Sequence, residues 1–216
     1  MYTFNPTLYF ITDSTGLSEE EFLYMVECAL DGGATLIQLR EKDRTTREYI
    51  HLAYKVHSIA RRYNVPLIVD DRVDVALAVG TEGVHVGQTD MPVSIARKLM
   101  GPDRIVGATT KTVTQAVEAY EQGADYLGVG AIYPTTTKVK TVLTTTDTLK
   151  DICAAVPIPV NAIGGLNKTN LDVLTGIPIA GICVVSAIMK SDNPCKSAHD
   201  LLILSKQLQN KLQNGK

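Results

Sequence analysis

Short apolar segments alternate with longer amphipathic segments along almost the whole chain. Eight short segments are rich in β-forming apolar residues, and several are apolar at nearly every position, as expected of strands buried on both faces of a parallel sheet. We predict strands at residues 8–12, 35–39, 66–69, 83–86, 104–108, 125–129, 159–163 and 179–185. The segments between them predict amphipathic helices, most clearly at residues 18–31, 45–63, 112–122 and 198–212.

Local signals mark the ends of these helices. Ser18 and Glu21 form a capping box at the start of the first one. Glycine follows four helical segments, where only this residue adopts a left-handed backbone without strain. These glycines are Gly32 with Gly33, Gly80, Gly123 and Gly176. The alternation therefore predicts repeated strand–helix units joined by short loops.

Eight such units in 216 residues predict an α/β protein, a (β/α)₈ TIM barrel formed as a single domain by residues 1–216. A doubly wound open sheet is the competing arrangement. Residues 13–16, which follow the first strand, lack the glycine-rich dinucleotide-binding motif of that fold. If the chain forms a barrel, its active site is expected in the loops that follow the strands.

Composition narrows the class of protein. Hydrophobic residues make up 45% of the chain and the net charge is −2, so no basic field favours nucleic acid or a membrane surface as a partner. Four cysteines without a CxxC pair favour reduced thiols over a disulfide framework. No signal peptide or membrane-spanning run is apparent, so we expect a cytoplasmic protein.

The second strand runs into two cations. Alternation along an extended chain places Gln38, Arg40 and Lys42 on one side, which in a barrel faces the mouth. Arg40 and Lys42 could bind a phosphate there, one as a bidentate fork and the other as a point charge. The alternative is an exposed turn in which they pair with Glu41 or Asp43.

The third and fourth strands are followed by Asp71 and Asp90. Two carboxylates beside phosphate-binding cations suit Mg²⁺, which takes one or two carboxylates and lets a substrate phosphate supply other ligands. Each has an ordinary alternative: Asp71 could pair with Arg72 or cap a helix, and Asp90 could cap the next helix. His85 lies within a strand, which favours a core or supporting role over a catalytic base.

Two further strands end in hydroxyl-bearing residues. Thr109 either faces the barrel mouth or caps the helix at residues 112–122. The longest loop follows the sixth strand and carries three threonines and Lys138, a composition typical of a substrate-binding lid. The alternative is a surface excursion without a binding role.

The last two strands end in Gly164-Gly165 and in Ser186. In barrels of this kind the loops after strands 7 and 8 often bind phosphate, and glycine lets main-chain N–H groups approach the anion. The alternative is that the glycines only form a tight turn. The residues alone therefore indicate a barrel enzyme that handles two phosphorylated groups.

The ordered motifs QLREK, DDRVDVALA, GVHVGQTD, GVGAIYPTTTK, AIGG and VVSAI resemble those of the thiamine-phosphate synthase (thiamine-phosphate pyrophosphorylase) family over nearly the whole chain. The resemblance implies a (β/α)₈ barrel and a Mg²⁺-dependent transferase. Such an enzyme joins 4-amino-2-methyl-5-hydroxymethylpyrimidine diphosphate to 4-methyl-5-(2-phosphoethyl)thiazole, or its carboxylate. The products are thiamine monophosphate and pyrophosphate, and the reaction is dissociative, through a pyrimidine carbocation.

The resemblance also implies roles for individual residues. The pyrimidine diphosphate would be bound by Gln38, Leu39, Arg40, Glu41, Lys42, Asp70, Thr109 and Lys138. The thiazole phosphate would be bound by Thr135, Thr136, Thr137, Gly165, Val185 and Ser186. Mg²⁺ would be held by Asp71 and Asp90, and the leaving diphosphate would be stabilised by the catalytic cations Arg40, Lys42 and Lys138.

The chain departs from the family pattern at a few positions. Asp70 stands where asparagine is usual, Thr109 where serine is common and Lys111 where histidine is frequent, while residues 139–146 lack the expected glycine and proline. Two alternatives remain: a thiazole tautomerase-like isomerase, and a non-catalytic module that binds a phosphorylated ligand. Small phosphorylated molecules are the expected partners. The sequence is compatible with assembly as a homo-oligomer.

Overall fold

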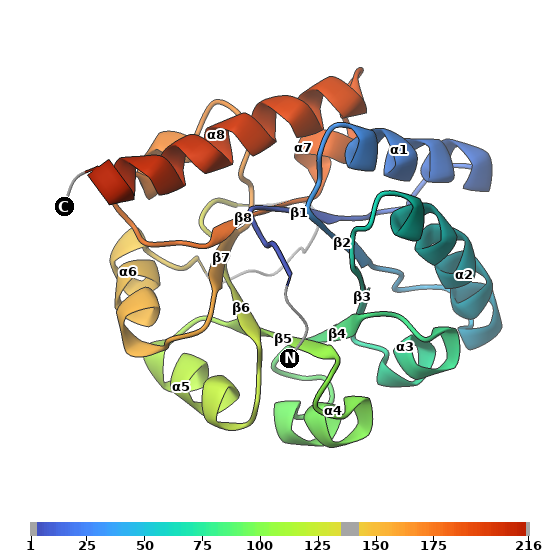
Figure 1. The fold of residues 1–216 in the computed structure, drawn as a ribbon, viewed down its shortest axis with the longest axis horizontal. Helices are drawn as coiled ribbons and strands as arrows, with labels where there is room; N and C mark the ends of the chain where they lie inside the picture. The colour runs from blue at the N-terminus through green and yellow to red at the C-terminus, as the bar shows by residue number, and fades with distance from the viewer. Residues whose placement is uncertain (1–3, 135–142, 215–216) are drawn as a thin grey trace.

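Eight parallel strands close into a barrel in the computed structural model of this chain, which describes residues 4–134 and 143–214 (Figure 1). The strands are β1 (Leu8–Ile11), β2 (Leu36–Leu39), β3 (Leu67–Asp70), β4 (Gly83–Val86), β5 (Ile105–Thr110), β6 (Tyr126–Gly130), β7 (Val160–Ile163) and β8 (Gly181–Val184). Each strand pairs with its neighbours in sequence, and β8 pairs with β1 to close the ring. The predicted barrel is confirmed.

Helices surround the strands (Figure 1). They are α1 (Glu19–Asp31), α2 (Thr46–Arg62), α3 (Val73–Val79), α4 (Val93–Met100), α5 (Val113–Glu121), α6 (Thr146–Ala155), α7 (Ser186–Met189) and α8 (Pro194–Asn214). The expected alternation differs at one unit, because β7 is followed only by the 3₁₀ helix η1 (Leu171–Leu174). Gly176 and Pro178 follow it closely and disfavour a longer helix there.

The predicted signals at the helix ends are present. The Ser18 side chain accepts a hydrogen bond from the Glu21 N–H, and the Glu21 side chain reciprocates at the Ser18 N–H. Of the two glycines after α1, Gly33 carries the left-handed backbone with a φ of 98°, whereas Gly32 has a φ of −69°. Gly32 is required for a different reason, since a Cβ at this position would lie 2.3 Å from the Cys195 carbonyl oxygen.

The side chains of the strands form two layers. Those pointing outward join the apolar faces of the helices in one large core. Those pointing inward fill the barrel, and the apolar members of this inner layer are Tyr9, Ile11, Leu36, Ile68, Ile105, Tyr126 and Cys183. Because the side-chain period of a strand is two, Gln38, Asp70, His85 and Thr109 also point inward, nearer the carboxyl ends of β2, β3, β4 and β5. The barrel thus changes from apolar to polar toward the carboxyl ends of its strands.

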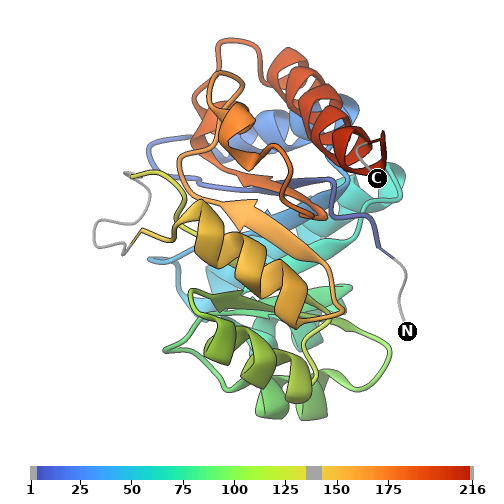
Figure 2. The same ribbon diagram turned by 90° about the vertical axis from the view of Figure 1, so that its left-hand side faces the viewer.

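The side view shows the strands running in one direction, so that all their carboxyl ends meet at one end of the barrel (Figure 2). Among the described helices, none has both the length and the apolar character needed to cross a membrane. The assignment of residues 1–216 to one domain stays a prediction.

Candidate active site

A cavity of about 260 Å³ opens at the carboxyl ends of the strands. Residues from every strand or the loop after it line its wall. Ten of the residues that the sequence singled out contribute to this wall: Gln38, Arg40, Lys42, Asp70, Asp71, Asp90, Thr109, Gly165, Val185 and Ser186. The barrel closure therefore brings together positions that lie up to 148 residues apart in the chain.

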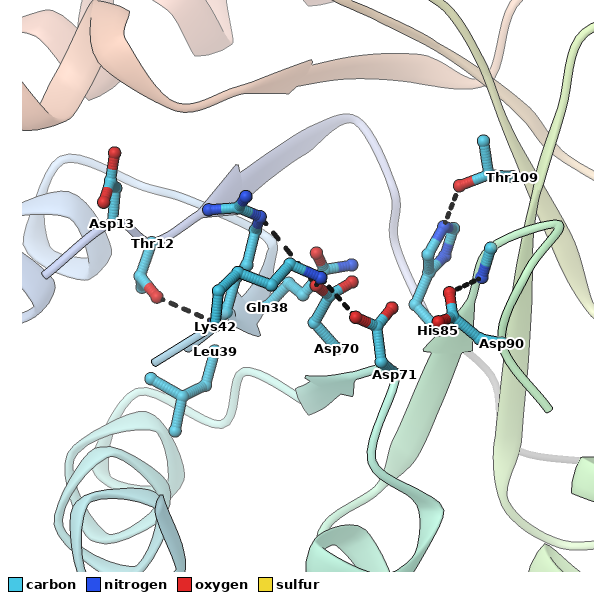
Figure 3. A network of polar contacts seen from close by, with 12 residues as sticks. Thr12, Asp13, Gln38, Leu39, Lys42, Asp70, Asp71, His85, Asp90 and Thr109 are labelled. Atoms are coloured by element: carbon cyan, nitrogen blue, oxygen red, sulfur yellow. Dashed lines mark hydrogen bonds and ion pairs between the residues drawn. The ribbon is translucent and has the colours of Figure 1, made fainter. Parts of the chain in front are cut away.

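Lys42 lies between two carboxylates. Its ammonium group is 2.8 Å from Oδ2 of Asp70 and forms a second ion pair with Asp71 (Figure 3). Arg40 Nε lies 3.9 Å from the same oxygen of Asp70. Both cations are therefore directed at the cavity and paired with residues of β3 and the loop after it. The alternative pairing of Arg40 and Lys42 with Glu41 or Asp43 is wrong, although Lys42 remains exposed at the rim of the cavity.

Asp70 is the buried partner in this group, with 8% of its surface exposed. Burial raises the pKa of its carboxyl group to about 6, and the charge of Asp71 adds to that rise. Lys42 and Arg40 act in the opposite direction. Burial lowers the pKa of Lys42, but the two carboxylates outweigh it and the net change is upward. Lys42 thus stays charged.

Asp71 occupies a strained backbone conformation. Its φ is 60°, the left-handed region that costs a non-glycine residue about 1–2 kcal/mol. The conformation is held by a 2.8 Å hydrogen bond from the Asp71 N–H to the His85 carbonyl oxygen. Arg72 pairs with Asp74 and supplies the N-cap position of α3, so neither alternative role suggested for Asp71 is realised.

Asp90 faces Asp71 from the neighbouring loop. Its Oδ2 accepts a 2.8 Å hydrogen bond from the Gly87 N–H, and the helix α4 is capped at Pro92 instead. Burial raises the pKa of Asp90, and the neighbouring Asp71 carboxyl group raises it further. Two acidic groups therefore lie near each other, an arrangement that a cation would stabilise.

This pair fits Mg²⁺ by the chemistry of its donors. Within residues 4–134 and 143–214, no group of three or more His, Cys, Asp or Glu side chains is arranged to hold a metal. Mg²⁺ in phosphoryl-transfer sites commonly uses one or two carboxylates, with water and substrate phosphate completing six oxygen ligands. Asp71 and Asp90 provide two such carboxylates beside the cations that would hold a phosphate.

A buried hydrogen-bonded network lies beneath the charged group. Gln38 Nε2 donates to Tyr9 Oη at 2.7 Å, and Tyr9 Oη lies 2.7 Å from Tyr126 Oη. Tyr126 Oη is 3.0 Å from His85 Nδ1, and His85 Nε2 is 2.8 Å from Thr109 Oγ1 (Figure 3). Burial lowers the pKa of His85 to about 4. Thr109 thus faces the cavity, whereas Thr112 caps α5.

Sequence reasoning missed Tyr9 and Tyr126 as members of the site. Both occupy apolar-looking strands and were treated only as strand formers. Alternation groups Tyr9 with Ile11 on one face of the first strand, but it does not say which face points inward. The structure supplies that direction, because Tyr9 pairs in register with Leu36, an inward position of β2.

Two residues of the QLREK segment point away from the cavity. Leu39 is fully buried in the outer core, and its carbonyl oxygen accepts a 2.6 Å hydrogen bond from Tyr49 Oη. Glu41 Oε2 accepts hydrogen bonds from Ser14 Oγ at 2.8 Å and from Arg44 Nε at 2.9 Å. These contacts shape the loop that carries the cations. A direct role of either residue in substrate binding stays a prediction.

The loop after β7 requires glycine. Gly164 and Gly165 have φ values of 105° and 66°. A Cβ on Gly165 would lie 2.7 Å from the Tyr133 Cβ and 2.8 Å from the Pro134 carbonyl oxygen. The glycines therefore form a tight turn, and this geometry is also compatible with a phosphate site at Gly165. Four predicted substrate-binding residues of the loop after β6 lie outside the described residues: Thr135, Thr136, Thr137 and Lys138.

Comparison with known proteins adds an independent observation. The sequence profile of a family described as thiamine monophosphate synthase matches residues 8–188. Thiamine-phosphate synthase 2 of Streptococcus pneumoniae is 52% identical over 186 residues, covering 86% of this chain and 89% of that protein. Thiamine-phosphate synthase of Enterococcus faecalis is 46% identical over 201 residues, covering 93% and 95%.

A solved structure agrees with these sequence matches. Thiamine phosphate pyrophosphorylase from Pyrococcus furiosus superimposes with a TM-score of 0.85 at 38% sequence identity. The superposition covers 94% of this chain and 96% of that one. The similarity therefore extends over nearly the whole of both chains.

Proposed function

This chain belongs to the thiamine monophosphate synthase family, and from that premise we propose that it forms thiamine monophosphate from a pyrimidine diphosphate and a thiazole phosphate. It is an enzyme, a transferase, as its relatives are. The first substrate is 4-amino-2-methyl-5-hydroxymethylpyrimidine diphosphate and the second is 4-methyl-5-(2-phosphoethyl)thiazole. The observation that carries the proposal is the convergence of Arg40, Lys42, Asp71 and Asp90 on one cavity.

The charges in the cavity suit a diphosphate leaving group. Breaking the bond between the pyrimidine methylene carbon and the diphosphate oxygen leaves the bonding electrons on the diphosphate. Arg40 and Lys42 would bind the resulting negative charge, as would Lys138. Preorganised cations of this kind stabilise a transition state strongly because little reorganisation is needed when the charge develops.

The metal would complete this arrangement. Asp71 and Asp90 would hold Mg²⁺, which when bound supplies further positive charge to the diphosphate. Asp70 would keep Lys42 in place through its 2.8 Å ion pair. The left-handed backbone at Asp71 is maintained by the main-chain hydrogen bond to His85.

The second substrate would enter from the opposite part of the cavity wall. Gly165, Val185 and Ser186 line that part, and we assign the thiazole phosphate to them together with Thr135, Thr136 and Thr137. The thiazole nitrogen then donates its lone pair to the pyrimidine methylene cation, forming the new carbon–nitrogen bond. No proton transfer by the enzyme is needed in this step, so its residues act by positioning and by excluding water.

A turnover assay tests the proposal. Purified protein is incubated with both substrates, with and without Mg²⁺, and thiamine monophosphate is detected as fluorescent thiochrome while pyrophosphate is measured separately. Mg²⁺-dependent formation of both products in equal amounts supports the proposal. Absence of product from protein whose folding is verified by circular dichroism contradicts it.

The two alternative functions are less well supported. A thiazole tautomerase-like isomerase has no need for the two carboxylates and the diphosphate-binding cations that this cavity contains. A non-catalytic phosphate-binding module would bind the pyrimidine diphosphate without dependence on Mg²⁺. A cytoplasmic location, assembly as a homo-oligomer and action without nucleic-acid or membrane partners remain part of the proposal.

A further inference from the structure

The buried network beneath the charged group connects two parts of the cavity wall. Gln38 and Thr109 both line the cavity, and they are linked through Tyr9, Tyr126 and His85 by four successive contacts of 2.7, 2.7, 3.0 and 2.8 Å. We refer to these five residues as the relay. It runs from β2 through β1, β6 and β4 to β5 inside the barrel.

The barrel interior has space for the relay because glycine occupies position 107. A Cβ on Gly107 would lie 2.1 Å from Tyr126 Cζ. Tyr9 and Tyr126 are 1% and 0% exposed, so water does not compete with their hydroxyl contacts. The hydrogen bonds of the relay therefore depend on one another.

The direction of each hydrogen bond follows from the number of protons available. Gln38 Nε2 can only donate, so Tyr9 Oη accepts from it and uses its own proton toward Tyr126. Burial keeps the pKa of both tyrosines well above 10, so each hydroxyl carries one proton. Tyr126 therefore donates to His85 Nδ1.

The direction continues to the cavity through the imidazole. His85 is buried between two neutral hydroxyl groups and is neutral, so it carries one proton. With Nδ1 accepting from Tyr126, the proton is on Nε2 and is donated to Thr109 Oγ1. Thr109 then keeps its own hydroxyl proton for a ligand. At the other end, the engaged nitrogen of Gln38 leaves the amide oxygen as an acceptor for a ligand.

We propose that the relay fixes an acceptor at Gln38 and a donor at Thr109, and that this fixed polarity makes the pocket select an aminopyrimidine over the corresponding oxopyrimidine. The proposal rests on the proposed function, which supplies the pyrimidine diphosphate. An aminopyrimidine offers an amino donor beside a ring-nitrogen acceptor. The oxo form reverses both, with a carbonyl acceptor beside a ring N–H. To match the reversed pattern, Gln38 has to present an amide N–H in place of its oxygen, and Thr109 has to accept a hydrogen bond in place of donating one. The relay disfavours this, because its direction leaves the oxygen of Gln38 and the hydroxyl proton of Thr109 for the ligand.

Tyr9, Tyr126 and His85 are positioning residues in this account, since they act through Gln38 and Thr109. The first test measures the histidine tautomer without any substrate. In ¹⁵N NMR of histidine-labelled protein, the His85 signals are assigned by their loss in His85→Gln. We expect Nε2 to be protonated and Nδ1 unprotonated. In Tyr126→Phe, we expect the form protonated at Nδ1 to gain population, because Nδ1 has lost its donor.

The second test measures selectivity. Dissociation constants for the 4-amino and 4-oxo pyrimidine diphosphates are determined by calorimetry for the wild type, Tyr126→Phe and Tyr9→Phe. We expect the preference for the amino compound to fall about tenfold in both variants, which is the effect of about one buried hydrogen bond. Tyr49→Phe is the matched control: it also removes a buried hydroxyl, with its hydrogen bonds to the carbonyl oxygens of Leu39 and Asp70, but outside the relay. Its preference should equal that of the wild type.

The outcomes separate the relay from the proposed function. Protonation of His85 at Nδ1 in the wild type would overturn the assigned direction. An unchanged preference in both relay variants, or an equal loss in Tyr49→Phe, would overturn the role in selectivity. If Tyr126→Phe does not fold, Tyr9→Phe provides the same comparison. Selective binding of the amino compound without formation of thiamine monophosphate contradicts the proposed function and leaves the relay supported.

Discussion

Lys42 donates a 2.8 Å hydrogen bond to Asp70, so the cation assigned to the substrate diphosphate already has a buried anionic partner. Asp70 lies at the end of β3 with 8% of its surface exposed, and Arg40 lies 3.9 Å from it. In the family that this chain resembles, asparagine is usual at this position. The carboxylate therefore competes with a bound diphosphate for the same two cations.

Replacing this carboxylate should strengthen anion binding. Asp70→Asn removes a negative charge while keeping the size of the side chain, so Lys42 and Arg40 become more available. We expect pyrophosphate to bind roughly three- to tenfold more tightly, because a competing ion pair worth about 1 kcal/mol is lost. Calorimetry at constant Mg²⁺ measures this affinity. Asp74→Asn, which removes an exposed partner of Arg72, is the control. Weaker binding in Asp70→Asn would show that Asp70 itself helps to hold the metal.

Replacing Asp71 should separate metal binding from folding. Asparagine tolerates the left-handed backbone found at this position, so Asp71→Asn removes the charge with little added strain. We expect turnover at millimolar Mg²⁺ to fall at least about 100-fold, the scale of losing one preorganised charge contact. The thermal midpoint should move by less than about 3 °C, since the change corresponds to less than 1 kcal/mol.

Direct metal binding supplies the check on this expectation. Titration of the substrate-free protein with Mn²⁺, followed by electron paramagnetic resonance, should show weaker binding in Asp71→Asn than in the wild type. Equal Mn²⁺ affinity in the two proteins would refute the assignment of Asp71 as a ligand. Full activity in the variant would refute it as well.

Much of the fold was predictable because the signals are local and repeated. Strands buried on both faces are apolar at nearly every position, and the alternation with helices left few arrangements other than a barrel. The exact ends of the strands were less predictable. Thr109 lies within β5 and Asp70 within β3, because the polar residues that mark the end of a strand in sequence still pair with neighbouring strands.

The site was predicted unevenly for a physical reason. Side chains that alternate inward along β2, such as Gln38 and Arg40, reach the cavity as expected, whereas Leu39 and Glu41 point the other way. The family resemblance assigns all five residues of the QLREK segment to the pyrimidine diphosphate. Alternation along the chain already separates the residues that face the cavity from those that face away. The partners of Lys42 and of Tyr126 could not be predicted, since they depend on the register between strands distant in the sequence.

The pair formed by Glu82 and His57 should make stability depend on pH. Glu82 Oε1 lies 3.0 Å from His57 Nε2, and its Oε2 accepts a 2.9 Å hydrogen bond from the Leu67 N–H. Burial raises the pKa of Glu82, but the hydrogen bonds from His57 and Leu67 outweigh it and the net change is downward. A carboxyl group with a lowered folded-state pKa stabilises the fold above its unfolded pKa of about 4.3 and loses this contribution as the pH falls through the folded value.

Glu82→Gln tests this dependence. We expect the free energy of unfolding in urea to fall by about 1.5–3 kcal/mol at pH 7, the usual contribution of a hydrogen bond to a charged group. The difference from the wild type should shrink below pH 4, where the wild-type carboxylate becomes protonated. Glu27→Gln, which removes an exposed ion pair with Arg62, should change stability little at either pH. A difference that stays constant with pH would contradict the role of the Glu82 charge.

Gly107 and Tyr126 should be energetically coupled because they occupy adjoining space inside the barrel. A Cβ at position 107 would lie 2.1 Å from Cζ and 2.3 Å from Oη of Tyr126. Gly107→Ala should therefore destabilise the protein by about 1–3 kcal/mol through overpacking. Tyr126→Leu removes the phenol atoms that the new methyl group would meet, and it should cost roughly 3 kcal/mol by leaving a cavity.

The double variant decides whether this contact is specific. If the new methyl group occupies the space left by the phenol, Gly107→Ala with Tyr126→Leu should be more stable than the sum of the two single changes by about 1–3 kcal/mol. Urea unfolding of all four proteins measures this coupling energy. Simple additivity would mean that the barrel accommodates the methyl group by moving its strands, and Gly107 would then not be what makes room for Tyr126.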